Sequence, residues 1–371
     1  MITADFTGSI VGIRKVYNET SDVVSNPTIS VLSPKAYQGT NLSIYQAFML
    51  KNAGTIKNLN FEINFNLGAS GNKTVRVAGL AIENTGIIDN VNISTTHNGV
   101  IKVTANSAVS ETVRVAGITT NNQGTISNSS VKVGQNTTTQ TFGIYSLNDG
   151  EVVSQVAGIA NQNSGTISKT FFSGDITSNY VGGITNENAG TIDRCYSLGN
   201  VNVVDTKYLS STSGKGKSII YGGIAGTMTK GVISNSYSRL TLKLTSSLEI
   251  TTNIGGLVGN IQVASNESAL IKNCYVVVNF TKDTTSAGNS GVYYFVSNSS
   301  TNLTCENNFY MVESENMGTE TTISGVTKVS LISELNNALK DLKESESNIY
   351  VTDSTYPYLV GMPEVPEVPE V

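Results

Sequence analysis

Histidine is the commonest protein ligand of catalytic zinc, and this 371-residue chain contains a single histidine, His97. A zinc site of the H-E-x-x-H type needs two histidines, so the sequence excludes it, along with any cluster of several histidines. His97 is followed by Asn98 and Gly99, a pair that indicates a turn. We therefore expect a solvated loop histidine, no metal ligand and no bound cofactor.

Four carboxylates could instead perform general acid–base chemistry, because β-helical lyases and hydrolases carry acids on a groove face. Glu83 and Glu187 occupy one repeated position of the sequence, and Asp89 and Asp193 occupy another. The equivalent residues of the neighbouring repeats are uncharged: Asn121, Gln162, Ser127 and Ser168. Because these positions accept other polar residues, we expect no catalytic residue among them.

Three cysteines raise the question of a disulfide or a metal site. Cys195 and Cys274 share a repeated position, which Ser236 occupies in the repeat between them. If the repeats stack, the two cysteines lie two steps of roughly 4.8 Å apart, which is beyond the span of a disulfide. The spacing leaves the register of Cys305 open. We expect all three cysteines to be buried, unpaired small hydrophobic residues.

Tyr196, Tyr237 and Tyr275 share an approximate position beside those cysteines, and on a regular strand they would point the opposite way. A strip of tyrosines on one face could contact a sugar or a protein. It could equally lie beneath a loop such as Asp205–Lys217, and we favour this covered arrangement.

A further repeated position is rich in asparagine. Its members are Asn52, Asn84, Asn122, Asn148, Asn163 and Asn188. Stacked asparagine amides can hydrogen-bond to one another along a repeat axis and can satisfy the turn backbone. We expect a structural ladder here, not a polar binding strip.

One repeated unit places all of these residues, and its clearest copy is Ala157–Phe172. Similar units begin at Ala78, Ala116, Gly182 and Gly222, and weaker ones near Ala47, Gly143 and Gly255. Within the unit, an apolar residue follows an early glycine, a turn glycine comes seven or eight residues later, and an isoleucine follows two residues after that. This is a strand–turn–strand pattern without helical periodicity.

Stacking of these units predicts an all-β protein, namely a parallel β-helix or β-solenoid. The shortest separation between equivalent positions, from Thr170 to Cys195, suits one coil of a three-faced β-helix. Longer units need extra residues, which we expect in polar loops. These loops are 68–73, 134–140, 205–217 and 281–289.

The predicted organisation has four parts. Residues 1–46 form an N-terminal β cap and first strands, and residues 47–310 form the β-solenoid repeats. Residues 311–361 form a C-terminal cap, with one helix at about 330–344 that begins after Ser330 and covers the open apolar end. Residues 362–371 repeat Pro-Glu-Val, which predicts a stiff linker to a further domain.

The net charge and the distribution of apolar residues exclude some classes of function. The net charge of −5 offers no electrostatic footprint for nucleic acid. No run of residues approaches the roughly 20 apolar positions of a membrane-spanning helix. Residues 1–40 lack the basic and apolar stretches of a signal peptide, so we expect any secretion signal to have been removed or to lie upstream.

The early-glycine pattern, followed by strands such as Asn273–Tyr275 and Asn235–Tyr237, resembles the GLUG repeats of bacterial secreted proteins. The resemblance covers roughly residues 5–310. It implies a right-handed β-helix at the cell surface, as in adhesin-like proteins and in non-catalytic regions of immunoglobulin A metalloproteases. We therefore expect a non-catalytic secreted or cell-surface module that displays or spaces other domains and contacts a host protein or glycan. The alternative is a carbohydrate-binding or carbohydrate-active β-helix of the polysaccharide lyase or hydrolase kind.

Overall fold

A computed structural model describes most of the chain. The described residues are 1–12, 26–32, 34–95, 100–105, 109–134, 143–148, 152–203, 218–244, 251–282, 291–297, 300–315, 318–320, 322–344, 347–352 and 355–362. His97, the loop 205–217, most of the loops 134–140 and 281–289, and the Pro-Glu-Val repeats from residue 363 onward lie outside them.

Strands of the described residues pair into three main sheets, which we call A, B and C, and the pairing is parallel except between β3 and β4. Sheet A contains β5 (Met49–Asn52), β8 (Ala81–Asn84), β12 (Thr119–Asn122), β17 (Ala160–Asn163), β21 (Thr185–Asn188), β25 (Ala225–Met228) and β29 (Val258–Ile261). Sheet C contains β3 (Tyr37–Gln38), β4 (Ile44–Gln46), β7 (Val75–Ala78), β11 (Val113–Ala116), β16 (Ser154–Ala157), β20 (Tyr180–Gly182), β24 (Ser218–Gly222), β28 (Thr251–Gly255) and β32 (Val292–Tyr293).

Sheet B is the largest of the three. Its strands are β1 (Ser9–Val11), β2 (Thr28–Leu32), β6 (Thr55–Ala69), β9 (Ile87–Thr95), β10 (Val100–Ala105), β13 (Thr125–Ser127), β14 (Ser130–Lys132), β15 (Gly143–Asn148), β18 (Thr166–Ser168), β19 (Phe171–Thr177), β22 (Thr191–Asp193), β23 (Tyr196–Val203), β26 (Gly231–Ser234), β27 (Tyr237–Leu244), β30 (Ala269–Lys272), β31 (Tyr275–Lys282), β33 (Leu303–Glu306), β34 (Asn308–Glu315) and β35 (Val326–Val329).

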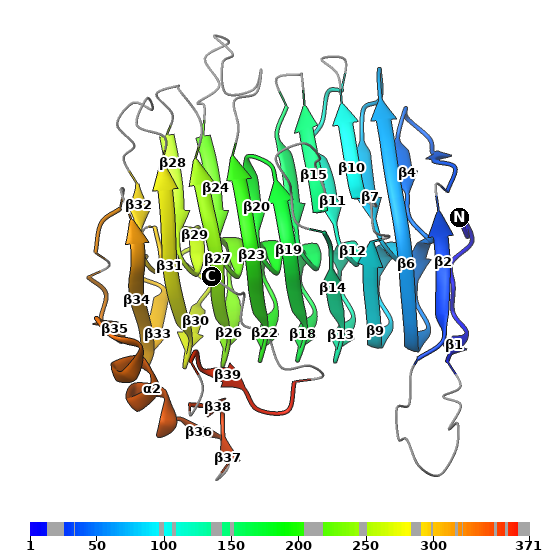
Figure 1. The fold of residues 1–371 in the computed structure, drawn as a ribbon. Coiled ribbons are helices and arrows are strands. Elements are labelled where there is room, and N and C mark those ends of the chain that lie inside the picture. The colour runs from blue at the N-terminus through cyan, green and yellow to red at the C-terminus, as the bar shows by residue number, and fades with distance from the viewer. Residues whose placement is uncertain are drawn as a thin grey trace, which may run out of the picture.

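The chain visits the sheets in the order C, A, B and then begins the next coil, so equivalent repeat positions lie side by side. For example, Ile126 of β13 pairs with Ile88 of β9 and with Ile167 of β18. The coils advance from the N-terminal end at one side of Figure 1 to α2 at the other. The structure is therefore the parallel β-helix that the repeats predict, and its coils wind with a right hand.

The extra residues of the longer coils partly extend sheet B. Strand β15 pairs in register with β10 and β19 of this sheet, and the backbone partner of Asn148 is Ala105. The prediction of a separate repeat near Gly143, with Asn148 in the asparagine position, is therefore wrong. This segment continues the strand of the preceding unit, because the alternation of Ile144 with polar neighbours fits the same core face.

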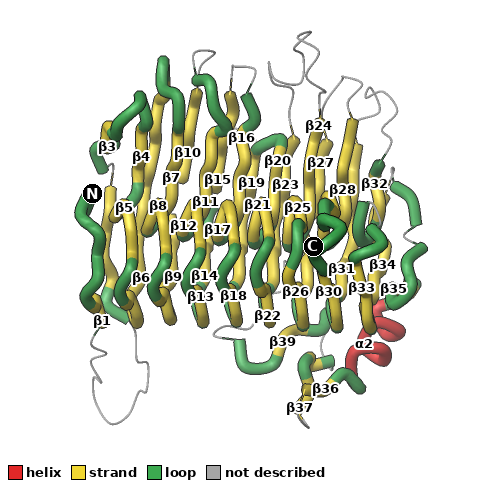
Figure 2. The backbone as a smooth tube through the Cα atoms, turned by 180° about the vertical axis from the view of Figure 1, so that it is seen from behind, coloured by secondary structure: helices red, strands yellow, loops and turns green. Residues whose placement is uncertain are grey.

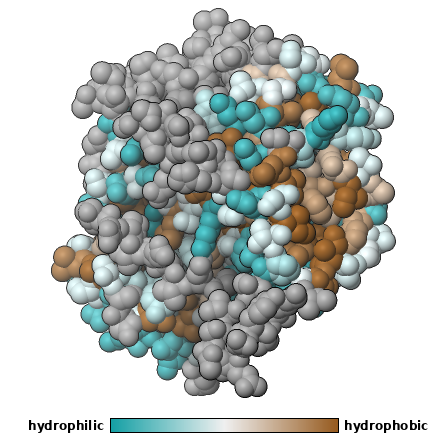
Figure 3. Space-filling model, turned by 45° about the vertical axis from the view of Figure 1, so that its right-hand side comes forward, coloured by the Kyte–Doolittle hydropathy of each residue, from teal (hydrophilic) through white to brown (hydrophobic). Residues whose placement is uncertain are grey.

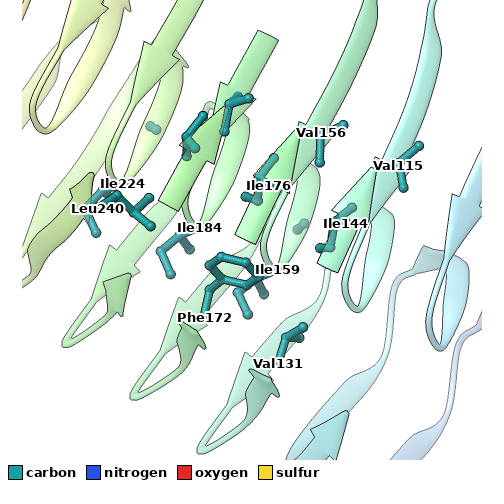
Figure 4. Packing of buried hydrophobic residues seen from close by; sticks show 14 of the residues in the cluster. Val115, Val131, Ile144, Val156, Ile159, Phe172, Ile176, Ile184, Ile224 and Leu240 are labelled. Atoms are coloured by element: carbon teal, nitrogen blue, oxygen red, sulfur yellow. The ribbon is translucent and has the colours of Figure 1, made fainter. Parts of the chain in front are cut away.

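The interior is filled by columns of apolar side chains. The isoleucines of the repeat, Ile88, Ile126, Ile167, Ile192 and Ile233, are all fully buried. Figure 4 shows Phe172 of sheet B close to Ile159, and Leu240 of sheet B close to Ile224. Both isoleucines immediately precede strands of sheet A. Each coil thus covers the apolar edge of its neighbour, and the array is held together by nearest-neighbour contacts.

Close approach between coils explains the early glycine of the repeat. A Cβ atom on Gly79 would lie 2.2 Å from the carbonyl oxygen of Gly117 on the next coil. A separate corner position requires left-handed backbone, with φ between 46° and 57°. Its residues are Asn58, Asn90, Asn128, Lys169, Arg194, Asn235, Asn273 and Asn307.

The C-terminal segment turns back along the side of the last coils (Figures 1 and 2). It contains α2 (Ile332–Lys340), β36 (Lys343–Glu344), β37 (Ser347–Asn348), β38 (Tyr350–Val351) and β39 (Tyr358–Leu359). The helix is shorter than the predicted span 330–344, and Leu331, not Ser330, is its N-cap residue. The Glu334 carboxylate accepts hydrogen bonds from the backbone N–H groups of Ser330 and Leu331. These bonds fix the point at which the helix begins.

The predicted role of this helix as a lid over the open apolar end is also wrong. Leu335 and Leu339 are fully buried, but they belong to a second hydrophobic cluster, on the outer face of sheet B, and not to the core inside the coils. The helix contacts β34, β35 and β38. The C-terminal segment therefore covers a side of the solenoid.

Candidate functional site

The tyrosine position identified in the sequence forms a continuous aromatic stack on the outer face of sheet B. Phe171, Tyr196, Tyr237 and Tyr275 come from successive coils, and neighbouring ring centroids are 4.6, 5.0 and 4.7 Å apart. Their planes deviate by 6° to 7°, so the rings lie face to face at the spacing of the strands. A row of stacked rings on an outer face is the kind of surface on which a sugar or a protein could pack.

The C-terminal segment buries this stack. Tyr196, Tyr237 and Tyr275 are at most 1% exposed. They share a hydrophobic cluster on the outer face with apolar residues of the C-terminal segment, namely Leu335, Leu339, Ile349, Tyr350 and Leu359. Removal from water raises the pKa of Tyr237 and Tyr275 well above the ordinary value for tyrosine.

Specific polar contacts also hold the cover in place. The Tyr350 hydroxyl donates to the carbonyl of Asn273 at 2.7 Å, and the Tyr275 hydroxyl donates to the carbonyl of Pro357. Two further contacts involve charge: Arg194 pairs with Glu344, and the guanidinium of Arg239 lies 3.6 Å from the ring centroid of Tyr356. The expectation of a covered tyrosine strip is therefore confirmed, and the cover that the structure shows is the C-terminal segment.

The carboxylates of the sequence analysis do not converge. Asp89 and Asp193 occupy one column of sheet B, with Ser127 and Ser168 between them. Each of the two accepts hydrogen bonds from the next coil: Asp89 from Ser127 and Asn128, and Asp193 from Ser234 and Asn235, all at 2.7 to 2.8 Å. These carboxylates join coils to one another.

Glu83 and Glu187 are likewise separated along sheet A by two intervening coils, which carry Asn121 and Gln162. The Glu187 carboxylate accepts a hydrogen bond from Gln162 at 3.1 Å. No second acid stands opposite either glutamate in this column, so the arrangement lacks the facing pair that glycoside hydrolysis requires.

The asparagine ladder is present over five coils. The side-chain amide of Asn52 donates to Asn84, Asn84 to Asn122, Asn122 to Asn163 and Asn163 to Asn188, each at 2.8 Å. These side chains are at most 2% exposed. The ladder is structural, as predicted, and it ends where Met228 takes the next place.

The cysteines are buried and unpaired, as predicted. Cys195 and Cys274 are on either side of Ser236, whose hydroxyl accepts a hydrogen bond from the backbone N–H of Cys195. Cys305 pairs with Ile271 and therefore takes the isoleucine position on the last coil. Burial raises the pKa of Cys305 to about 11, and it raises the pKa values of Cys195 and Cys274 further.

Sequence reasoning missed one surface feature, a shallow polar recess of about 210 Å³ on the outer face of sheet A. It is lined by Asn121, Gln162, Asn163, Ser164, Glu187 and Ala189. The column Glu83–Asn121–Gln162–Glu187 is visible in the sequence, but the recess beside it is not. The recess presents amides and one carboxylate, groups that can hydrogen-bond to sugar hydroxyls.

No group of three metal-binding side chains occurs in the part of the chain that the structure describes. Within the same residues, no helix has the length and apolar character needed to cross a bilayer. The sequence matches no protein-family model and no curated protein.

Proposed function

We propose that this chain is a non-catalytic secreted or cell-surface β-helix module with a structural or adhesive role. In this role it displays or spaces other domains and contacts a host protein or glycan. The proposal includes membership of the GLUG-repeat proteins, which the stacking of the early glycines supports.

One observation carries the proposal: the side chains best suited to chemistry or ligand stacking are already used to hold the solenoid together. The carboxylates of Asp89 and Asp193 bond to the next coil. The aromatic stack lies under the C-terminal segment. A chain built in this way offers a stiff, elongated scaffold, because each coil is fixed by ladders on both sides.

The test uses the full chain in two assays. Incubation with a panel of polysaccharides should release no reducing ends above those of a heat-denatured sample. Beads coated with the chain should be retained on at least one extracellular protein or glycan surface. Release of reducing ends from any polysaccharide would contradict the non-catalytic role.

The recess on sheet A favours a second candidate, carbohydrate binding without catalysis. It contains a single acid, Glu187, hydrogen-bonded to Gln162. On a glycan array, Gln162→Ala and Glu187→Ala should abolish any signal that depends on the recess. Thr227→Ala changes the same column one coil further on, outside the recess lining, and should leave that signal unchanged.

A further inference from the structure

The first coil has an open strand edge. Strands β1 and β2 pair with β6 on one side, and among the described residues no strand pairs with them on the other. The backbone N–H of Asn60 donates to the carbonyl of Pro27 at 2.9 Å. In a parallel pair every second residue directs its backbone groups to the same neighbour, so this bond shows which residues of β2 face β6. Ile29 and Val31 therefore bond toward β6, and the backbone groups of Ser30 point away from the molecule.

This edge lacks the features that keep natural edge strands apart. The sequence of β2, Thr-Ile-Ser-Val-Leu, contains no charge and no proline, and its pairing with β6 runs without a bulge. Large apolar side chains are exposed in this coil, namely Ile2 at 38%, Val11 at 44% and Leu32 at 57%. In Figure 3, where this end of the molecule faces forward and to the right, hydrophobic atoms gather on the surface.

Among the described residues, this coil is also the outermost layer of the core. Phe6, Ile10, Ile29 and Val31 pack against the core but are only partly buried. Their partners one coil further in, such as Phe61 and Ile63, are fully buried, because a coil covers them on each side. The exposed surface is therefore the surface by which every inner coil binds its neighbour.

We propose that two copies of this chain associate through their first coils, with β2 of one copy pairing antiparallel with β2 of the other around Ser30. A two-fold axis normal to sheet B reverses the strand direction and the solenoid axis but keeps the core-facing side of the sheet inside. Ile29 of one copy then lies opposite Val31 of the other, on the core side. A single strand from another protein would cover only sheet B, whereas a second coil also covers the exposed ends of Phe6 and Ile2.

Sedimentation of the full chain over a range of concentrations tests this proposal, which is independent of the proposed function. The wild type should reach twice the chain mass of 39.2 kDa. Ser30→Pro removes an outward N–H, and Leu32→Lys places a charge at the edge, so both variants should remain monomeric with an unchanged β signal in circular dichroism. Ile87→Lys, a matched change at a residue 46% exposed on an inner coil, should still dimerise. A monomeric wild type, or dimers of Ser30→Pro, would overturn the proposal.

A second measurement tests the geometry. Ser30 is exposed, whereas Cys195 and Cys274 are fully buried and Cys305 is 9% exposed, so Ser30→Cys in a Cys305→Ser background can be labelled with pyrene maleimide under native conditions. Antiparallel pairing around residue 30 brings the two labels together and should give excimer emission that is lost when Leu32→Lys is added. A dimer with monomer-type pyrene emission would show that the contact lies elsewhere and would overturn the assignment.

Discussion

Tyr237 and Tyr275 stack on neighbouring coils with ring centroids 4.7 Å apart, yet their hydroxyl groups differ. The Tyr275 hydroxyl donates to the carbonyl of Pro357 in the C-terminal segment. The Tyr237 hydroxyl is buried and finds no hydrogen-bond partner among the described residues. Of these two stacked tyrosines, therefore, only Tyr275 has a hydroxyl that is hydrogen-bonded among the described residues.

This difference predicts opposite effects of removing a hydroxyl. Tyr237→Phe should leave the free energy of unfolding unchanged or raise it, because an unpaired buried polar group is removed. Tyr275→Phe loses the hydrogen bond to the carbonyl of Pro357 and should lower the free energy of unfolding by about 1 kcal/mol. Urea unfolding of both variants checks the prediction, and a larger loss for Tyr237→Phe would contradict it.

The asparagine ladder predicts a dependence on position. Asn122→Ala removes two ladder bonds in the middle of the ladder, to Asn84 and Asn163, whereas Asn52→Ala removes one at its start. Each unsatisfied buried partner costs about 1–3 kcal/mol, so Asn122→Ala should be the more destabilising. Thermal unfolding of the two variants under the same conditions checks this prediction. Equal losses of stability would mean that the ladder bonds contribute little.

The isoleucine column predicts a steep cost for charge. Ile167 is fully buried between Ile126 and Ile192, and Ile167→Asp would place an unpaired carboxylate there at a cost of several kcal/mol. Ser164→Asp, on the exposed turn of the same coil, should change stability by less than about 0.5 kcal/mol. Equal melting temperatures for these variants would require the isoleucine column to face solvent.

Thiol reactivity should follow burial. In denaturant without reductant, all three cysteines should react with a thiol reagent. In the native protein at about pH 8, Cys305 should react first, since it is 9% exposed, whereas Cys195 and Cys274 are fully buried. Peptide mapping after alkylation identifies the modified residue. Early alkylation of Cys195 would contradict the coil packing described here.

The fold could be predicted from the sequence because each coil repeats the same strand–turn–strand pattern of residues. Ile126 and Ile167 are in equivalent positions of the repeat, and they pair in register in the structure. The assignment of Asn148 to the asparagine position was wrong, because Asn148 lies on β15, which pairs with β10 of sheet B. By residue types alone, such a continuing strand resembles the start of a new repeat.

The cover of the aromatic stack could not be placed from the sequence. The apolar residues of α2 predict a buried helix face, but they do not specify the surface against which that face packs. A signal does exist in the column itself. Asn60, Asn92 and Ser130 form hydrogen bonds with one another on the early coils, and the same column becomes aromatic from Phe171 onward, where the cluster with the C-terminal segment begins. A change from polar to aromatic residues along one column therefore indicates where a cover begins.

The most direct test of the central claim, that the aromatic stack is sealed structure and not a ligand surface, is nitration of tyrosines in the intact native chain followed by peptide mapping. The reagent modifies accessible phenolate, and burial keeps the Tyr237 and Tyr275 hydroxyls protonated. Tyr37, 38% exposed, serves as the internal standard. The account predicts nitration of Tyr37 with Tyr196, Tyr237 and Tyr275 unmodified. Nitration of these three at the rate of Tyr37 would contradict it.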